Sequence, residues 1–251
     1  MNDTLQLISP PGYGPVVPFD KHSHGRLGLL PERRYAWCSR LNSVFINAIE
    51  FARIATEYPI AFVHEQSSRE FIPVAILGLR DRENLFVDAS GGWRWPAYVP
   101  AYCRRHPFCV AQVADGAEPK PRKLICVQAD QLSPDGAALF DSDAQPSPAW
   151  NAILRLIESM ESARQATRVL CKRLESLDLL VPFDAVASAP GRTTLHLQGM
   201  YRVDEQKLAT LPMRNLKTLL NKGELRAVYA HLISLENFAR LLDLEGKRNG
   251  R

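Results

Sequence analysis

The sequence predicts an α+β protein, in which a mostly antiparallel sheet packs against one long helix and several shorter helices. Short runs rich in Ile, Val and Phe, separated by polar turns, occupy the first half of the chain and are typical of hairpins. One amphipathic pattern covers residues 150 to 178, and shorter helical patterns close the chain. Because turns rather than helices join the strands, we expect an antiparallel meander.

The composition is that of a globular protein: 251 residues, 46% hydrophobic and 23% charged, which excludes disordered and collagen-like chains. The formal net charge of +4 favours solubility and predicts no nucleic-acid partner. No apolar run approaches the roughly 20 residues that cross a bilayer, so we expect no membrane span. No apolar segment precedes Pro10, so no Sec signal is expected and the cytoplasm is the predicted location.

Proline distribution predicts how the chain divides. Residues 1–34 are rich in proline and glycine and should form an extended N-terminal arm, whose Val16, Val17 and Phe19 pack on a sheet edge. A second segment of this kind, 129–149, is interpreted as a linker. It separates an N-terminal α+β lobe at 35–128 from a C-terminal α+β lobe at 150–251 that packs on the first.

Hydrophobic spacing predicts the elements of the N-terminal lobe. Apolar residues at intervals of three and four predict a helix over 43–57, which ends before Tyr58-Pro59 because the residue before proline disfavours the helical conformation. The segment 93–108 contains three prolines and is interpreted as a loop with a short helix. The predicted strands are Ile60–His64, Phe71–Leu77, Asn84–Val87 and Leu124–Gln128.

The C-terminal lobe should begin with the long helix at 150–178, followed by Pro182 as its stop. Strands at Ala185–Ala187 and Thr193–Gln198 flank a Pro190-Gly191 turn, and Met200–Val203 extends the second of them. The remaining predicted helices are Gln206–Leu211 with Asp204 as N-cap, Met213–Leu220, and Leu225–Leu242 after a turn at Gly223.

Two groups of residues in the chain, the cysteines and the arm histidines, are of types that bind metals. The five cysteines are scattered and contain no CxxC pair, so we expect reduced, mostly buried thiols rather than disulfides or a zinc site. His22 and His24, at i and i+2 in an extended arm, would point the same way and could share a metal. No HxxxH or HExxH spacing supplies a third ligand, so a solvated pair is favoured and no cofactor is expected.

The densest cluster of recognition residues lies between residues 93 and 106. Aromatic rings stack on flat ligands, and arginine binds carboxylate or phosphate through two parallel hydrogen bonds. The cluster therefore predicts a site for a small molecule or peptide with an acidic group. The alternative is that the rings cap the hydrophobic core, and both can hold. The candidate residues are Trp93, Trp95, Tyr98, Tyr102, Arg104, Arg105 and His106.

Catalytic signatures are missing from the sequence. It has no Gly-x-Ser-x-Gly elbow, no GxGxxG pattern and no GK[ST] pattern, so neither a nucleophile nor a phosphate loop is indicated. The residues favour a non-catalytic protein without excluding an enzyme.

The chain resembles the bacterial SapC family along most of its length. The resemblance rests on Glu50-Phe51, Tyr58-Pro59-Ile60, Pro73 to Leu79, Asn84 to Asp88, Trp93, Tyr98 to Tyr102, Arg105 to Phe108, Leu139-Phe140, Gly199 to Glu205, Leu208, Leu211, Gly223 and His231, with His24 near the start. After Leu139-Phe140 the chain departs from the family's glycine-bearing pattern and reads Asp141-Ser142-Asp143-Ala144. This family differs from the peptide-transporter permease of the same name, which spans membranes.

The resemblance implies a protein of undefined molecular activity, from a family named for an association with a surface layer. Relatives are encoded beside outer-membrane receptors and halogenase-like proteins, which implies an accessory role in nutrient uptake or modification. The expected function is thus a non-catalytic ligand-binding or accessory protein, with a further protein partner open. The alternatives are a metal-assisted enzyme using His22 and His24, and a surface-layer structural protein.

Overall fold

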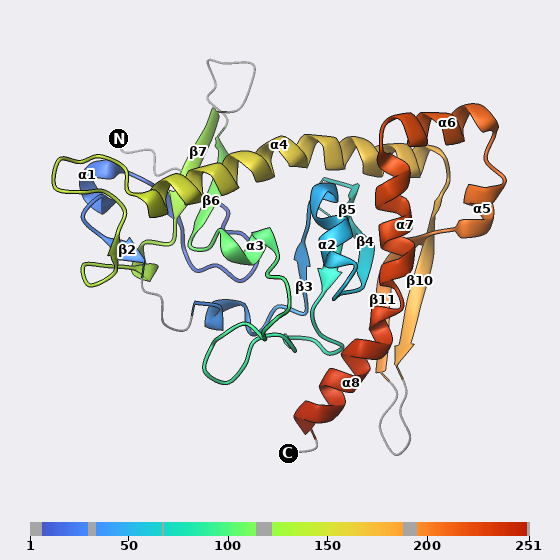
Figure 1. Ribbon diagram of the computed structural model, residues 1–251, viewed down its shortest axis with the longest axis horizontal. Helices are drawn as coiled ribbons and strands as arrows, with labels where there is room; N and C mark the ends of the chain where they lie inside the picture. The colour runs from blue at the N-terminus through green and yellow to red at the C-terminus, as the bar shows by residue number, and fades with distance from the viewer. Residues whose placement is uncertain (1–6, 30–33, 67, 114–121, 188–194, 250–251) are drawn as a thin grey trace.

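A single long helix runs along the molecule and carries a sheet near each end (Figure 1). The computed structural model describes residues 7–29, 34–66, 68–113, 122–187 and 195–249. Its α-helices are α1 Lys21–His24, α2 Phe51–Ile54, α3 Ala101–Arg104, α4 Pro148–Ser176, α5 Glu205–Ala209, α6 Met213–Asn221, α7 Glu224–Ser234 and α8 Asn237–Asn249. Single 3₁₀ turns occupy η1 Ala36–Cys38, η2 Ala48–Glu50 and η3 Ala129–Gln131.

In the described part of the chain the strands form three sheets, all of them antiparallel where they pair. A five-stranded sheet has the order β10-β11-β4-β5-β3, and two three-stranded sheets have the orders β1-β7-β6 and β8-β2-β9. The predicted α+β class with an antiparallel sheet is therefore confirmed. The strands are β1 Val17–Pro18, β2 Gly28–Leu29, β3 Ser43–Phe45, β4 Ile60–Glu65, β5 Glu70–Ile76, β6 Phe108–Val113, β7 Arg122–Val127, β8 Leu132–Ser133, β9 Ala137–Ala138, β10 Leu180–Ala187 and β11 Leu195–Val203.

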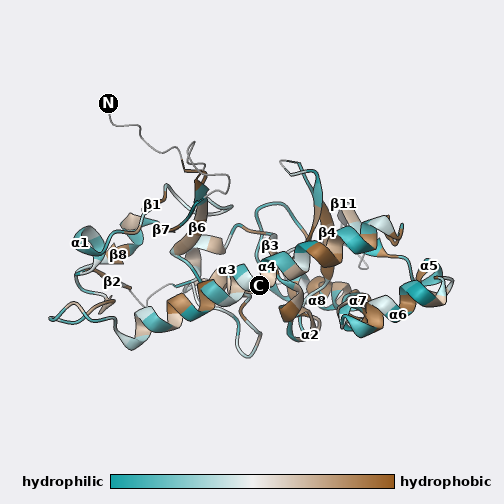
Figure 2. Ribbon diagram, turned by 90° about the horizontal axis from the view of Figure 1, so that it is seen from above, coloured by the Kyte–Doolittle hydropathy of each residue, from teal (hydrophilic) through white to brown (hydrophobic). Residues whose placement is uncertain are grey.

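Helix α4 belongs to both hydrophobic clusters of the molecule. Near its start, Trp150 and Ile157 pack in a cluster with Phe108 beneath β6 and β7. Near its end, Leu170 and Leu174 join the larger core under the five-stranded sheet, which α2, α7 and α8 cover (Figure 1). Figure 2 shows polar and apolar residues alternating along α4, as expected for a helix that buries one face. Helix α4 therefore joins the β1-β7-β6 sheet to the five-stranded sheet.

The predicted helix 43–57 is wrong at its beginning. Residues 43–45 form β3, the edge strand of the five-stranded sheet, where Val44 is opposite Ala75 and buried. The helical part starts only after Asn47, whose backbone N–H donates to the Glu50 carboxylate at 3.3 Å. Val44, a β-branched residue of β3, happens to lie at a spacing that also fits an amphipathic helix.

The predicted strand Asn84–Val87 is also wrong. The Asn84 side chain donates to the Cys38 carbonyl at 3.0 Å and accepts from the Phe86 N–H at 2.9 Å, so it supplies the hydrogen bonds a strand partner would have made. Only Val87 forms a bridge, with Trp93. Strand β6 was not predicted; it begins at Phe108, the last residue of the proline-rich segment 93–108, and continues to Val113.

The arm residues pair as expected. In β1, Val17 is opposite Val127 of β7, and Val16 is buried. The segment 129–149 carries η3, β8 and β9, and its Leu139 is fully buried. The division into arm, two lobes and linker stays a prediction.

The long helix is confirmed, with Ser147 as its N-cap accepting from the Trp150 N–H. Pro182 does not mark its end, because the chain turns at Asp178 with φ of 54° and Pro182 lies inside β10. The predicted turn at Pro190-Gly191 and the residue Thr193 lie outside the described residues. Asp204 caps α5, accepting from the N–H groups of Gln206 and Lys207.

The last predicted helix, 225–242, is two helices, α7 and α8, which separate at residues 235–236. The turn before α7 is at Gly223 as predicted, with the left-handed φ of 70° that glycine adopts without strain. None of the described helices is long and apolar enough to cross a membrane.

His231 of α7 completes the junction between β4 and β11. These strands share only two residue pairs, Met200 with Val63 and Tyr201 with Phe62. If that register continued, Val203 would be opposite Ile60; instead the imidazole lies between them. Its Nε2 accepts from the Val203 N–H at 3.0 Å, and its Nδ1 donates to the Ile60 carbonyl at 2.9 Å.

Ser234, one helical turn after His231, also bonds to Ile60 at the position where a neighbouring strand would have paired. Its hydroxyl accepts from the Ile60 N–H at 2.9 Å. Both hydrogen-bonding groups of Ile60 are therefore satisfied by α7. The ring of His231 is fully buried, and burial lowers the pKa of its imidazole to about 4.

The buried His231 should make stability depend on pH below neutrality. The unfolded chain takes up a proton near the ordinary histidine pKa of about 6.5, whereas the folded chain resists protonation until pH 4, so stability falls as pH falls through this window. We expect His231 to account for about 2 kcal/mol of unfolding free energy lost between pH 7 and pH 5. Urea unfolding of the wild type and of His231→Gln at both pH values measures this contribution.

The substitution His22→Gln, at an exposed position of α1, is the matched control for the loss of a histidine. His106, whose pKa is also lowered to about 4 by burial, should add a similar loss of its own. An H231Q variant with the full wild-type pH dependence would contradict the assignment.

Candidate functional site

The segment 93–108 is bound into the fold through side-chain hydrogen bonds. The Trp93 indole N–H donates to the Tyr58 hydroxyl at 3.1 Å, and that hydroxyl donates to the Tyr98 carbonyl at 2.5 Å. Tyr58 is completely buried. Trp93, one of the predicted ligand contacts, therefore positions the loop.

Tyr102, Arg105 and His106 lie against the N-terminal arm. Tyr102 is 4% exposed, and its hydroxyl donates to the Pro11 carbonyl at 2.7 Å. His106 is buried and stacks on Trp37 with ring centroids 4.2 Å apart. The Arg105 guanidinium lies 4.8 Å from the centre of the Tyr102 ring, and its Nε lacks a hydrogen-bond partner among the described residues. These three residues mainly hold the arm in place.

Trp95 has the opposite environment. Its side chain is 90% exposed and takes part in none of the ring contacts found in the described part of the chain. The structure does not bring it together with the buried members of the predicted cluster.

Tyr98 and Arg104 are the two predicted residues that share a surface hollow. This small hollow, of about 210 Å³, lies between α2, α3 and α4 and is lined by Asn47, Ile49, Glu50, Arg53, Tyr98, Ala101, Arg104, Leu156, Ser159 and Met160. Two guanidinium groups lie near the Tyr98 ring, with Cζ atoms 5.3 Å (Arg104) and 5.9 Å (Arg53) from its centre. Neither arginine forms an ion pair with a carboxylate among the described residues.

Arg53 was not among the residues predicted for the site. Arg53 falls on the polar side of the 43–57 pattern, which reads as an ordinary solvated charge. Only the tertiary fold, by placing α2 beside α3, brings it to Tyr98.

A buried carboxylate, Glu50, forms the base of the small hollow. It accepts three hydrogen bonds: from the Asn47 N–H at 3.3 Å, the Tyr98 hydroxyl at 3.0 Å and the Ala101 N–H at 2.8 Å. Burial, with the negative charge of Glu50 as the next cause, raises the pKa of Tyr98 to about 12, so this phenol stays neutral and donates. Glu50 thus connects η2 with the segment 98–101.

Asn47 and Thr167 connect the same turn to α4. The Asn47 side-chain amide donates to the Met160 carbonyl at 3.2 Å, and the Ala48 N–H donates to the Thr167 hydroxyl at 2.9 Å. The backbone around the hollow is therefore fixed on three sides.

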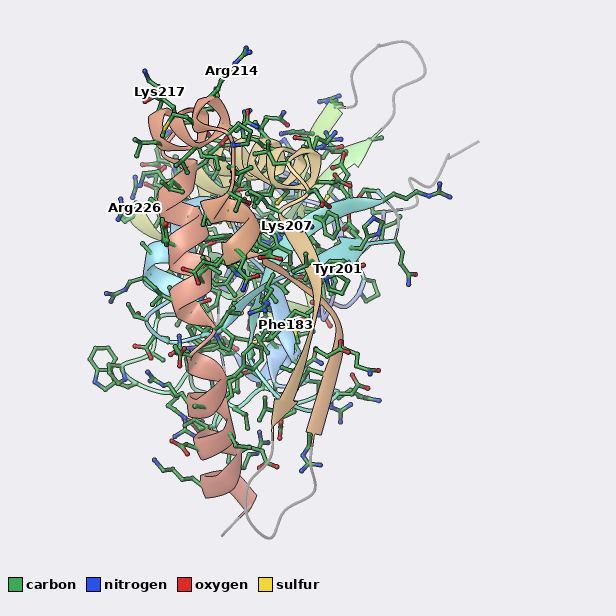
Figure 3. All side chains as sticks on the ribbon, turned by 90° about the vertical axis from the view of Figure 1, so that its right-hand side faces the viewer. Phe183, Tyr201, Lys207, Arg214, Lys217 and Arg226 are labelled. Atoms are coloured by element: carbon green, nitrogen blue, oxygen red, sulfur yellow. The ribbon has the colours of Figure 1, made fainter. Side chains whose placement is uncertain are left out.

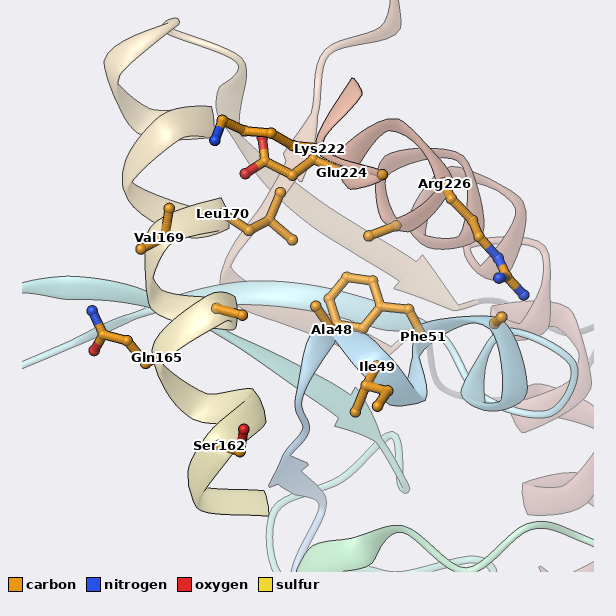
Figure 4. Close-up of a pocket in the computed structure, with 14 residues that line it drawn as sticks. Ala48, Ile49, Phe51, Ser162, Gln165, Val169, Leu170, Lys222, Glu224 and Arg226 are labelled. Atoms are coloured by element: carbon orange, nitrogen blue, oxygen red, sulfur yellow. The ribbon is translucent and has the colours of Figure 1, made fainter. Parts of the chain in front are cut away.

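A larger hollow, of about 750 Å³, lies on the other side of Ile49, which lines both. In Figure 4, Val169 and Leu170 of α4 face Ala48 and Phe51, with Lys222 and Glu224 above them and Arg226 at the far end. The floor is apolar and its rim is charged.

The two arm histidines do not have the geometry expected of them. Lys21–His24 forms the single helical turn α1, so His22 and His24 point about 200° apart rather than the same way. The His24 Nδ1 already accepts from the Asp20 N–H at 3.0 Å. Within the described ranges, no group of three or more His, Cys, Asp or Glu residues is arranged to hold a metal ion.

All five cysteines are buried and none forms a disulfide, as expected. Burial raises the pKa of the Cys109 thiol to about 11 and that of Cys171 to about 12. Because the thiolate is the nucleophile, these side chains are unreactive near neutral pH.

Removing the Glu50 carboxylate should destabilise the fold more than any change at Trp95. Glu50→Ala leaves three donors without their acceptor, which should cost about 2–4 kcal/mol of unfolding free energy. Trp95→Ala removes an exposed side chain and should change it by less than about 0.5 kcal/mol. Urea unfolding of both variants checks this. Glu158→Ala, at an exposed position of α4, is the control for loss of a carboxylate; an E50A protein as stable as E158A would show that the network contributes little.

The comparison with known proteins gives one match. No curated protein and no solved structure matches the chain. The family model of SapC matches residues 19–241, which include both hollows, Glu50 and His231. The chain therefore belongs to the SapC family.

Proposed function

We propose that the protein is a non-catalytic binding protein that holds the acidic group of a small molecule or peptide in the small hollow. The observation that supports this is the pair of guanidinium groups near the Tyr98 ring, which have no carboxylate partners among the described residues. An arginine at the edge of a hollow that has no carboxylate partner favours a carboxylate or phosphate ligand.

Hydrogen bonding leaves donors for such a ligand. Arg104 donates from Nε to the Val99 carbonyl at 3.0 Å and from Nη2 to the Tyr98 hydroxyl at 2.8 Å. These two bonds fix the plane of the guanidinium, and its Nη1 bonds to none of the described residues. The single charge of Glu50 offsets one of the two guanidinium charges, which leaves a net positive site.

The size of the small hollow limits what enters it. About 210 Å³ is below the range of roughly 300–1,000 Å³ of pockets for whole drug-sized ligands. It suits the acidic end of a ligand whose remaining part lies along α4 outside.

Within the cell, such a protein would serve as an accessory factor of nutrient uptake or modification in the cytoplasm. The metal-dependent and surface-layer alternatives gain no specific support from the described residues.

A pair of peptides tests the proposal. A short apolar peptide with a free C-terminal carboxylate should bind, and the same peptide amidated at its C-terminus should bind at least about tenfold more weakly, because it lacks the anion that the arginines recognise. Isothermal titration at low and at physiological salt measures both affinities. Equal affinities would contradict recognition of an acidic group.

Substitutions then locate the binding. Arg53→Gln removes an exposed guanidinium that makes no structural hydrogen bond to the described residues, so it should weaken binding of the free-carboxylate peptide about tenfold without changing the melting temperature. Arg155→Gln, an exposed arginine of α4 that lines neither hollow, is the matched control. If R53Q and R155Q bound the peptide equally well, the small hollow would not be the site.

A further inference from the structure

We infer that the larger hollow is a docking groove for an acidic amphipathic helix of a partner protein. The inference goes beyond the carboxylate site, since it concerns a different surface, and it does not require that site to be occupied. It follows from the shape of the groove, its exposed apolar floor and the charge of its rim.

The shape of the groove is set by three helical elements. Helix α4 lines it with Ser162, Gln165, Ala166, Val169 and Leu170, which share one face at the i, i+3, i+4, i+7 and i+8 spacing. These residues extend over about 12 Å of helix axis, at about 1.5 Å per residue. The opposite wall is the start of α7, and η2 with α2 forms the floor. An elongated channel between two helices has the form that receives a third.

The walls consist of side chains that let another helix approach closely. Ala166 on α4 and Ala227 on α7 face the groove from its two walls, and Ala48 and Ala52 lie beneath it. Small side chains allow the backbones of neighbouring helices to pack at a shorter distance.

The groove also exposes apolar surface that the chain itself leaves uncovered. Ile49 is 73% exposed and Val169 is 41% exposed. Burying such side chains against a partner stabilises a complex by roughly 25 cal/mol for each Å² removed from water. A helix with an apolar stripe would contact both.

The charge of the rim selects an acidic partner. Lys222 and Arg226 are exposed and form no ion pair with a described residue, whereas Glu224, the acidic residue between them, is bound to Arg173 at 2.7 Å. The same end of the molecule carries further exposed cations, Arg214 and Lys217 of α6, as Figure 3 shows. Charges of this sign attract an acidic surface and fix its orientation.

Concavity distinguishes this occupant from an anionic membrane. A bilayer surface meets convex basic helices and cannot enter a hollow of about 750 Å³ between helices. The side chains of a docked helix can contact Ala48 and Ala52 on the floor and Val169 on the α4 wall. The observations therefore favour a protein helix.

A designed peptide serves as the probe. It is a labelled 18-residue helix with leucines at i, i+3, i+4 and i+7 spacing, glutamates on its other face, and both termini blocked. We expect the full-length protein to bind it in fluorescence anisotropy at physiological salt, and to bind a scrambled peptide of the same composition at least tenfold more weakly. Equal binding of the two peptides would overturn the inference, because charge alone would then explain it.

Two groove variants should each weaken binding at least tenfold. Lys222→Glu combined with Arg226→Glu reverses the rim charge, and Val169→Asp places a charge on the apolar wall. The matched control reverses two exposed arginines of α4 outside the groove, Arg155→Glu with Arg164→Glu, and should leave binding within threefold. Equal losses in the rim and control variants would overturn the inference. Melting temperatures within a few degrees of wild type establish that each variant is folded.

The remaining outcomes separate this inference from the proposed function. Arg53→Gln should leave peptide binding unchanged; if it alone abolished binding, the glutamates would be entering the small hollow and the groove inference would fail while the carboxylate site stood. Vesicles of phosphatidylcholine and phosphatidylglycerol test the membrane alternative. Vesicle binding lost in the rim variant, without any peptide binding, would also overturn the docking of a helix.

Discussion

The buried carboxylate of Glu50 is the interaction on which the arrangement of both hollows depends. A charge held away from water is tolerated only when hydrogen-bond donors surround it. Here the donors are Asn47, next to Glu50 in the same turn, and Tyr98 and Ala101, which are 48 and 51 residues further along the chain. The turn that carries Glu50 is also bonded to α4 through Asn47 and Thr167. The small hollow is the gap beside this polar centre, and the larger hollow lies on the other side of Ile49, where the start of α7 forms the far wall.

This polar centre explains why the aromatic segment is only partly a ligand surface. Trp93 and Tyr98 bond to Tyr58 and Glu50, so their polar atoms are used within the fold. The same bonds hold Arg104 and Tyr98 rigidly at the rim of the small hollow. A binding group that is fixed before the ligand arrives loses less entropy on binding, so structural use of the segment supports its use in recognition.

The sequence was informative where a pattern was long or a side chain had one evident function. The α+β class, the long helix and the cap at Asp204 were predicted from periodicity and capping chemistry, and the packing of the arm on a sheet edge from its composition. The cap at Ser147 was not predicted. Residues 43–45 and Asn84–Val87 were predicted wrongly, because Val44 of β3 also fits a helical spacing and the Asn84 side chain makes hydrogen bonds in place of a strand partner. Of the site, Tyr98 and Arg104 were predicted from local composition, whereas Arg53 and the groove beside α4 arise from contacts between distant elements.

The insertion of His231 and Ser234 between β4 and β11 bears on how the halves of the chain depend on each other. A chain ending before β11 would leave the outer edge of β4 open, and one ending before α7 would leave both polar groups of Ile60 without their hydrogen-bond partners. Open edges pair with other chains, so such a fragment would tend to aggregate rather than persist as a small independent unit. During synthesis, the β3, β4 and β5 strands of the five-stranded sheet therefore stay prone to aggregation until the last third of the protein has emerged.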